Sequence, residues 1–141
     1  MTASITFHAA DVPIPLTQRT AIKHWLQSVA KKEKCTISHI AYIFCSDEYL
    51  HNINVKFLKH DTFTDIITFD YSEGKILSGE IYISAQRVKD NAAVYGASYI
   101  HELCRVLVHG LLHLSGYNDK TKTEKESMRQ REEYHLGALF E

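Results

Sequence analysis

The feature that most constrains this chain is a pair of histidines, His109 and His113, near the end of a long apolar run. Apolar residues cover more than one face of the helix expected to open at Ser98, as in a helix buried at the centre of a domain. Four residues make about one helical turn, so both imidazoles share a face, with Cβ atoms about 5–6 Å apart. Two imidazoles at that separation can each place a nitrogen about 2.0–2.1 Å from one Zn²⁺. The run therefore predicts a buried helix that carries two metal ligands.

A third ligand is expected just beyond the end of this helix. Gly116 can adopt the left-handed conformation that ends a helix and turns the chain back, which would bring Asp119 to the histidines. The spacing matches the metzincin motif H-E-x-x-H-x-x-G-x-x-H. However, Gly110 stands where those proteases have their general-base Glu, and Asp119 replaces their third His. The ligand arrangement is zincin-like without the peptidase base; the alternative is that both imidazoles are hydrogen-bonded core residues.

Composition narrows the class of protein. A chain of 141 residues is expected to form one domain, residues 1–141. The net charge of −1 provides no overall basic field, so binding of nucleic acid would need a local patch, a metal or a partner. Three widely spaced cysteines favour reduced thiols over a disulfide framework. We find no secretory signal and no apolar run of membrane-spanning length, and therefore expect a cytoplasmic protein that does not enter membranes.

The remaining pattern predicts an α+β domain with a small mixed sheet packed with helices. Segments rich in β-branched and aromatic residues, or alternating in polarity, are expected to be strands. They are residues 4–7, 37–45, 65–71 and 78–83, the last two plausibly antiparallel across a turn at 73–75.

Helices are expected where a capping residue precedes an amphipathic pattern. The expected caps are Thr17, Ser46, Ser84 and Ser98, and a closing surface helix follows Asp119. The residues expected to face inward are Ile22, Trp25, Leu26 and Val29 in the first helix, Leu50, Ile53 and Phe57 in the second, and Met128, Leu136 and Leu139 in the last.

A polar loop before the third strand is a second place where chemistry could reside. Its polar residues are Asn54, Lys56, Lys59, His60, Asp61, Thr64 and Asp65. Taken alone, they favour an ordinary solvated loop with local turn bonds. Glu102 lies about 10 Å from His109 along the helix axis, too far to share its metal, and is expected to pair with Arg105.

Three segments together resemble one known family. Residues 109–117 follow the motif H-G-x-L-H-L-x-G-Y-D-H, and residues 78–83 are similar to L-G-D-I-x-I. Residues 54–61 and 64–69 are similar to N-x-x-Y-R-x-x-D-x-x-T-D-V-L-S-F. These are the motifs of the YbeY family, the metal-dependent rRNA maturation endoribonucleases of bacteria. The chain departs from them at Asp119, at Asn118 and at Leu58, which takes the place of the family's Arg.

The resemblance implies a zincin-like fold with a site that cuts single-stranded RNA by hydrolysis assisted by a zinc-bound water. It implies a role in small-subunit rRNA maturation and ribosome quality control, with RNA and the ribosome or a ribosomal protein as partners. The metal ligands would be His109, His113 and Asp119. Zn²⁺ suits them, and Ni²⁺ or Fe²⁺ is possible. Because Gly110 leaves no base, His60 and Asp61 are the candidates to move the proton, and Lys59 or Lys56 would replace the missing Arg at the phosphate.

Two other functions remain open from the residues alone. One is a metallohydrolase that acts on another substrate, such as a peptide, against which the missing Glu at position 110 counts. The other is a ribosome-associated RNA-binding factor with a structural metal, which would require a fourth protein ligand. The sequence leaves the oligomeric state open.

Overall fold

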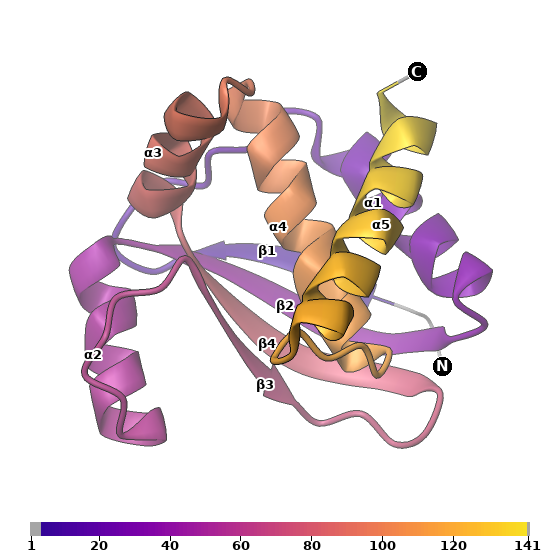
Figure 1. Ribbon diagram of the computed structural model, residues 1–141, viewed down its shortest axis with the longest axis horizontal. Helices are drawn as coiled ribbons and strands as arrows, with labels where there is room; N and C mark the ends of the chain where they lie inside the picture. Colours follow the sequence, from indigo (N-terminus) through magenta and orange to yellow (C-terminus); the bar gives the residue numbers. More distant parts are fainter. Residues whose placement is uncertain (1–3, 141) are drawn as a thin grey trace.

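A four-stranded sheet with the order β1-β2-β4-β3 forms the base of the structure, a computed structural model that describes residues 4–140 (Figure 1). Strands β1 and β2 run parallel, as do β2 and β4, whereas β3 is antiparallel to β4 and forms an edge. The strands are β1 (Ser4–Ala9), β2 (Thr36–Cys45), β3 (Ile66–Asp70) and β4 (Ile76–Ser84). The sheet is therefore mixed, and the expected antiparallel pairing of its last two strands is confirmed.

Helices cover both faces of this sheet unequally. They are α1 (Arg19–Lys32), α2 (Asp47–Leu58), α3 (Ala85–Tyr95), α4 (Tyr99–Leu114) and α5 (Lys122–Leu139). Helix α4 crosses above the sheet and contacts α1, α3 and α5, as Figure 1 shows. On the opposite face, α2 covers a small second cluster around Leu50 and Ile67. The predicted α+β fold with a central, buried motif helix is confirmed.

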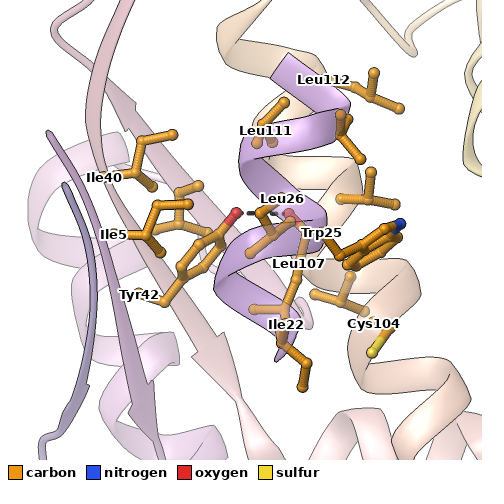
Figure 2. Packing of buried hydrophobic residues seen from close by; sticks show 14 of the residues in the cluster. Ile5, Ile22, Trp25, Leu26, Ile40, Tyr42, Cys104, Leu107, Leu111 and Leu112 are labelled. Carbon is orange, nitrogen blue, oxygen red and sulfur yellow. Dashed lines mark hydrogen bonds between the residues drawn. The ribbon is translucent and has the colours of Figure 1, made fainter. Parts of the chain in front are cut away.

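The main core lies where α1 and α4 meet the sheet. The apolar side of α1 that includes Trp25 and Leu26 packs there with Leu107 and Leu111 of α4 (Figure 2). Tyr42 of β2 is completely buried, and its hydroxyl donates a hydrogen bond of 2.8 Å to the Leu107 carbonyl. Burial raises the pKa of this phenol, so the hydroxyl stays protonated and continues to donate. The bond gives α4 a fixed polar attachment to the sheet within an otherwise apolar contact.

Three of the four expected helix caps are present. The side chains of Ser46, Ser84 and Ser98 each accept a hydrogen bond from the backbone N–H three residues later. Each bond satisfies one of the N–H groups left unpaired at a helix start. Helix α5 begins with a reciprocal capping box between Thr121 and Glu124. Local signals therefore predicted the starts of α2, α3 and α4, whereas the cap at Thr121 was not among the expectations.

Two expectations about individual residues are wrong. Helix α1 begins after Gln18 and not at Thr17, and no side chain caps it. The preceding Leu16 is buried in the core at 2% exposure, which holds the chain in a non-helical path up to that point. Phe57 was expected to face inward but is 60% exposed. The cluster under α2 is too small to cover it, and it packs edge-on against Phe69 at the rim, with ring centroids 6.2 Å apart.

Two glycines allow α4 to approach the sheet closely. A Cβ atom at Gly79 of β4 would lie 2.6 Å from the Phe69 carbonyl oxygen and 3.0 Å from Leu114 Cδ2. A Cβ atom at Gly110 of α4 would lie 2.9 Å from Ile81 Cδ1. Side chains larger than glycine would overlap these atoms, so Leu114 packs directly on Gly79 and Ile81 directly on Gly110.

We predict that Gly79→Ala lowers the free energy of unfolding by about 1–3 kcal/mol, because the added methyl group overpacks a backbone contact. Urea unfolding followed by circular dichroism measures the change. Gly137→Ala is the matched control, since a Cβ atom there meets nothing within 4 Å. It lies inside α5, so alanine should leave stability unchanged or raise it by up to about 1 kcal/mol. Equal stability of Gly79→Ala and the unchanged chain would contradict the close packing.

Candidate metal centre and its cleft

The end of α4 sets the position of the predicted ligands. Gly116 adopts a left-handed φ of 109°. The Tyr117 N–H donates to the Leu112 carbonyl at 3.0 Å, and the Gly116 N–H donates to that of His113 at 3.0 Å. These are the bonds of a Schellman turn, which satisfies carbonyls at a helix end and reverses the chain. The reversal brings Asp119 next to the histidines, as the sequence predicted.

Three ligand atoms converge beyond this turn. His109 Nε2 and His113 Nε2 lie 3.0 Å apart, and each lies 3.4 Å from Asp119 Oδ2. A tetrahedral ion with ligands at about 2.0–2.1 Å has ligand–ligand separations of about 3.3 Å. The observed separations are close to that value. The group therefore has the dimensions of three ligands of one small divalent cation.

Hydrogen bonds on the far side of each ring fix which nitrogen faces the cation. His109 Nδ1 lies 2.6 Å from Glu132 Oε2, and His113 Nδ1 lies 3.0 Å from the Tyr117 carbonyl oxygen. Both partners are acceptors, so each Nδ1 carries the proton and each Nε2 presents a lone pair. Two lone pairs and a carboxylate then face one another without a donor between them. That arrangement is favourable only with a positive charge at its centre.

The electrostatics of His109 point the same way. Burial lowers the pKa of its imidazole, but the hydrogen bond and negative charge of Glu132, together with Asp119 and Asp65, outweigh burial and leave the pKa raised. The surroundings of this ring therefore favour a positive charge on it or beside it.

Glu132 of α5 is a functional residue that the sequence reasoning missed. It is 5% exposed, and while one oxygen accepts from His109, the other accepts from Arg105 Nη1 at 3.1 Å. Carboxylates behind a metal-binding histidine orient the ring and increase its basicity. A signal was present: Glu132 falls four residues after Met128 and four before Leu136, both of which were expected to face inward. An acidic residue on an apolar helix face needs a buried partner.

A second network, also missed, holds the turn from behind. Glu33 at the end of α1 accepts hydrogen bonds from the Tyr117 hydroxyl at 2.8 Å and from Arg131 Nε at 3.1 Å, and lies 2.6 Å from His135 Nε2. Burial alone would raise the pKa of the Glu33 carboxyl, but these partners outweigh it and lower the pKa. Because the carbonyl of Tyr117 orients His113, Glu33 supports the metal centre through it.

The centre opens into a cleft of about 840 Å³. Helix α4 supplies its floor, and the walls come from α5 on one side and from β3 with the preceding loop on the other. His109, His113 and Asp119 line it together with Tyr95, Arg105, Lys125, Arg129, Glu132, Asn54, His60, Asp65 and Asp70. The predicted ligands thus face an open cleft.

The three predicted catalytic residues of the loop are placed differently. His60 lines the cleft, whereas Lys59 and Asp61 are outside its lining. The side chain of Asp61 is 87% exposed and pairs with His51 Nε2 at 2.8 Å. Lys59 caps α2 in a left-handed conformation with φ of 56°. Of the three, the structure brings only His60 into the space shared with the metal ligands.

Asp65 also enters the cleft at the start of β3. Its backbone carbonyl accepts from the Ser84 N–H at 3.0 Å, which anchors it to the sheet. Burial raises the pKa of its carboxyl, and the nearby His109 opposes this only in part. A carboxyl whose pKa is raised beside metal ligands is suited to accept and release a proton.

Position 110 cannot supply a base to this cleft. The Cβ direction of Gly110 leads to Ile81 and Ile66 of the sheet. A glutamate there would collide with the sheet before reaching the ligands. Glu102 does line the cleft, but it pairs with Arg105 at 3.6 Å, as the sequence predicted.

Among the residues from 4 to 140, no helix is long and apolar enough to cross a membrane.

Comparisons with known proteins agree on one family. The family model described as Endoribonuclease YbeY matches residues 4–139. An Endoribonuclease YbeY of Cytophaga hutchinsonii is 55% identical over 136 residues, covering 95% of this chain and 94% of its own. That of Flavobacterium johnsoniae is 49% identical over 130 residues, covering 92% and 93%. A solution structure of a Thermotoga maritima protein is similar, with a TM-score of 0.66, 28% identity and coverage of 96% and 91%.

We predict about one zinc ion per purified chain, with metal lost from His109→Ala and from Asp119→Ala because two ligands hold a divalent ion much more weakly than three. Elemental analysis measures the content after dialysis. His24→Ala on the exposed side of α1 is the control and should keep its metal. Retention of metal by Asp119→Ala alone would show that the third ligand lies elsewhere.

We predict that Glu132→Gln lowers the affinity for Zn²⁺ by about 10- to 100-fold, because the amide orients the His109 ring less firmly and withdraws its negative charge. Competition with a chromogenic chelator measures the affinity. Glu126→Gln, an exposed position on the same helix, is the matched control. Equal affinities of the two variants would mean that Glu132 serves only the packing of α5 on α4.

Proposed function

Because the chain belongs to the YbeY endoribonuclease family, its activity is hydrolysis of RNA, and we propose that it cuts single-stranded RNA at a centre formed by His109, His113 and Asp119. The observation that supports this most is the convergence of three acceptor atoms, 3.0–3.4 Å apart, on an open cleft. We further propose that the substrate is small-subunit rRNA and that the protein acts on ribosomes in the cytoplasm.

The donor set fits Zn²⁺, with Ni²⁺ or Fe²⁺ as alternatives. When bound by three protein ligands, such an ion supplies a Lewis acid for the phosphodiester and lowers the pKa of water at its open position. The chain's own part is to hold both imidazoles with Nε2 facing inward, through Glu132 and the Tyr117 carbonyl. The carboxylate of Asp119 leaves the centre with less positive charge than a third histidine would.

Proton transfer is assigned to the wall of the cleft opposite α5. His60 and Asp65 both line the cleft there, and either can take a proton from water or return one to the leaving oxygen. Asp61 and Lys59 flank His60 in the chain and remain part of the proposal. Asp61 would act by positioning the loop, since its carboxylate is hydrogen-bonded to His51. The roles differ from those in a metzincin, where the base follows the first histidine on the same helix.

The two alternative functions receive less support from the structure. A structural zinc usually has four protein ligands, whereas the cluster found among residues 4–140 offers three. A peptidase would need a base, and the position next to His109 is packed against the sheet. With a net charge of −1, the protein would rely on its local site and on a ribosomal partner to reach RNA.

We predict that zinc-loaded protein cuts a single-stranded RNA oligonucleotide and that His113→Ala lowers the rate by more than about 100-fold, the upper range for residues that only support a metal. Gel analysis of end-labelled RNA measures the rate, with a blunt RNA duplex and an unstructured peptide as competing substrates. His24→Ala serves again as the control. Unchanged cutting by His113→Ala, or cutting of the peptide in place of RNA, would overturn the proposed function.

A further inference from the structure

The cleft contains cations that the metal centre does not use. The loop that resembles the family's arginine segment has Leu58 at that position, and neither neighbouring lysine replaces it within the cleft. Lys59 lies outside the lining, and the Lys56 ammonium is placed 5.3 Å from the ring centroid of Phe57. The cationic side chains that do line the cleft are Arg105, Lys125 and Arg129.

Only two of these three cations are available to a ligand. Arg105 is paired with Glu132 at 3.1 Å and with Glu133 at 2.6 Å, so its charge is neutralised within the protein. Lys125 and Arg129 are exposed, and neither forms an ion pair with any residue between 4 and 140. They are therefore two positive charges without a salt-bridge partner on the wall of a site that must hold a polyanion, although Arg129 also lies near the carboxylates of Glu102 and Glu133.

Their placement on α5 follows from the packing of that helix. Met128 and Glu132 are 2% and 5% exposed and hold one face of α5 against α4. Lys125 and Arg129 lie on the same side, four residues apart, so their Cβ atoms are about 5–6 Å from each other. Arg129 precedes Glu132, the partner of His109, by three residues, or about 4.5 Å along the axis. The two cations thus form a short row along α5 on the wall of the cleft.

The opposite wall has the opposite charge. Asp65 and Asp70, which belong to β3 or directly precede it, line the cleft across from α5 without an arginine or lysine beside them in that lining. A phosphodiester chain is attracted to the α5 wall and repelled by the β3 wall. Its bases would then point toward β3 and the loop, where His60 offers a hydrogen-bonding group.

We propose that Lys125 and Arg129 each bind a backbone phosphate of the RNA next to the scissile one, so that the strand runs along α5 with its bases toward β3. This inference rests on the proposed function and adds to it the orientation of the substrate and two residues that position it. The contacts are to phosphate, so they should hold RNA of any sequence equally. They also supply the local patch that a chain with a net charge of −1 requires.

The test compares two double variants that each remove two positive charges. The cleft variant combines Lys125→Ala and Arg129→Ala, and the control variant combines Lys89→Ala and Lys122→Ala. Both control lysines are exposed and lie outside the cleft lining. KM and kcat are measured with zinc-loaded protein and a ten-nucleotide single-stranded RNA at several salt concentrations. The Kd for single-stranded DNA of the same length, which offers the same phosphates, is measured by fluorescence anisotropy.

Each phosphate contact on a single strand contributes a slope of about 0.7 in log affinity against log salt. For the cleft double variant we expect KM and Kd to rise about 10- to 30-fold near 0.1 M salt and the slope to fall by about 1.4, with kcat and zinc content unchanged. The control should change neither KM nor slope by more than about twofold. If the unchanged protein cuts RNA normally and the two double variants behave alike, the inference is overturned while the proposed function stands. If the unchanged protein cuts no RNA, both are overturned.

Discussion

Close packing of α4 on the sheet is the constraint from which the rest of the site follows. Where the helix crosses β4, Gly79 and Gly110 leave no room for a larger side chain, so α4 is positioned by Leu114 against Gly79 and by Ile81 against Gly110. His109 and His113 then lie on an adjacent side of the helix, facing the cleft. The same contact excludes a base at position 110. A hydrolytic site built on this helix has to obtain its proton-transfer groups from another element.

The candidate metal centre is preorganised at an electrostatic cost. Two imidazole lone pairs and a carboxylate repel one another across 3.0–3.4 Å unless a cation joins them. Two chains of hydrogen bonds hold them in place: Arg105 to Glu132 to His109, and Glu33 to Tyr117, whose carbonyl orients His113. The first series of hydrogen bonds ends on the charged side chain of Arg105 and the second on that of Glu33, and each of these is paired with an opposite charge. The free-energy cost of this repulsion is offset by packing and hydrogen bonds in the surrounding elements, as in other sites that hold their ligands in place.

Features that depend on neighbours in sequence could be predicted. The caps at Ser84 and Ser98 and the turn at Gly116 each follow from a few adjacent residues, and so does the spacing of the metal ligands. Features that depend on distant segments could not. Glu132 and Glu33 become functional only because α5 packs against α4 and α1, and Phe57 is exposed because α2 covers little of the sheet. The roles of His109, His113 and Asp119 as metal ligands, the catalytic roles of Lys59, His60 and Asp61, and the domain limits of 1–141 stay predictions.

The hydrogen bonds from α5 also determine when during synthesis the site can form. Glu33 contacts Arg131 and His135, which follow it in the chain by 98 and 102 residues. The hydrogen-bond partner of His109 is Glu132, which follows it by 23 residues. A nascent chain emerges from the ribosome with its amino end first. The sheet and α4 are therefore made before α5 is available, and the hydrogen bonds that orient His109 and hold Glu33 form only once α5 has emerged. Synthesis of α5 is thus the step that completes this hydrogen-bond network.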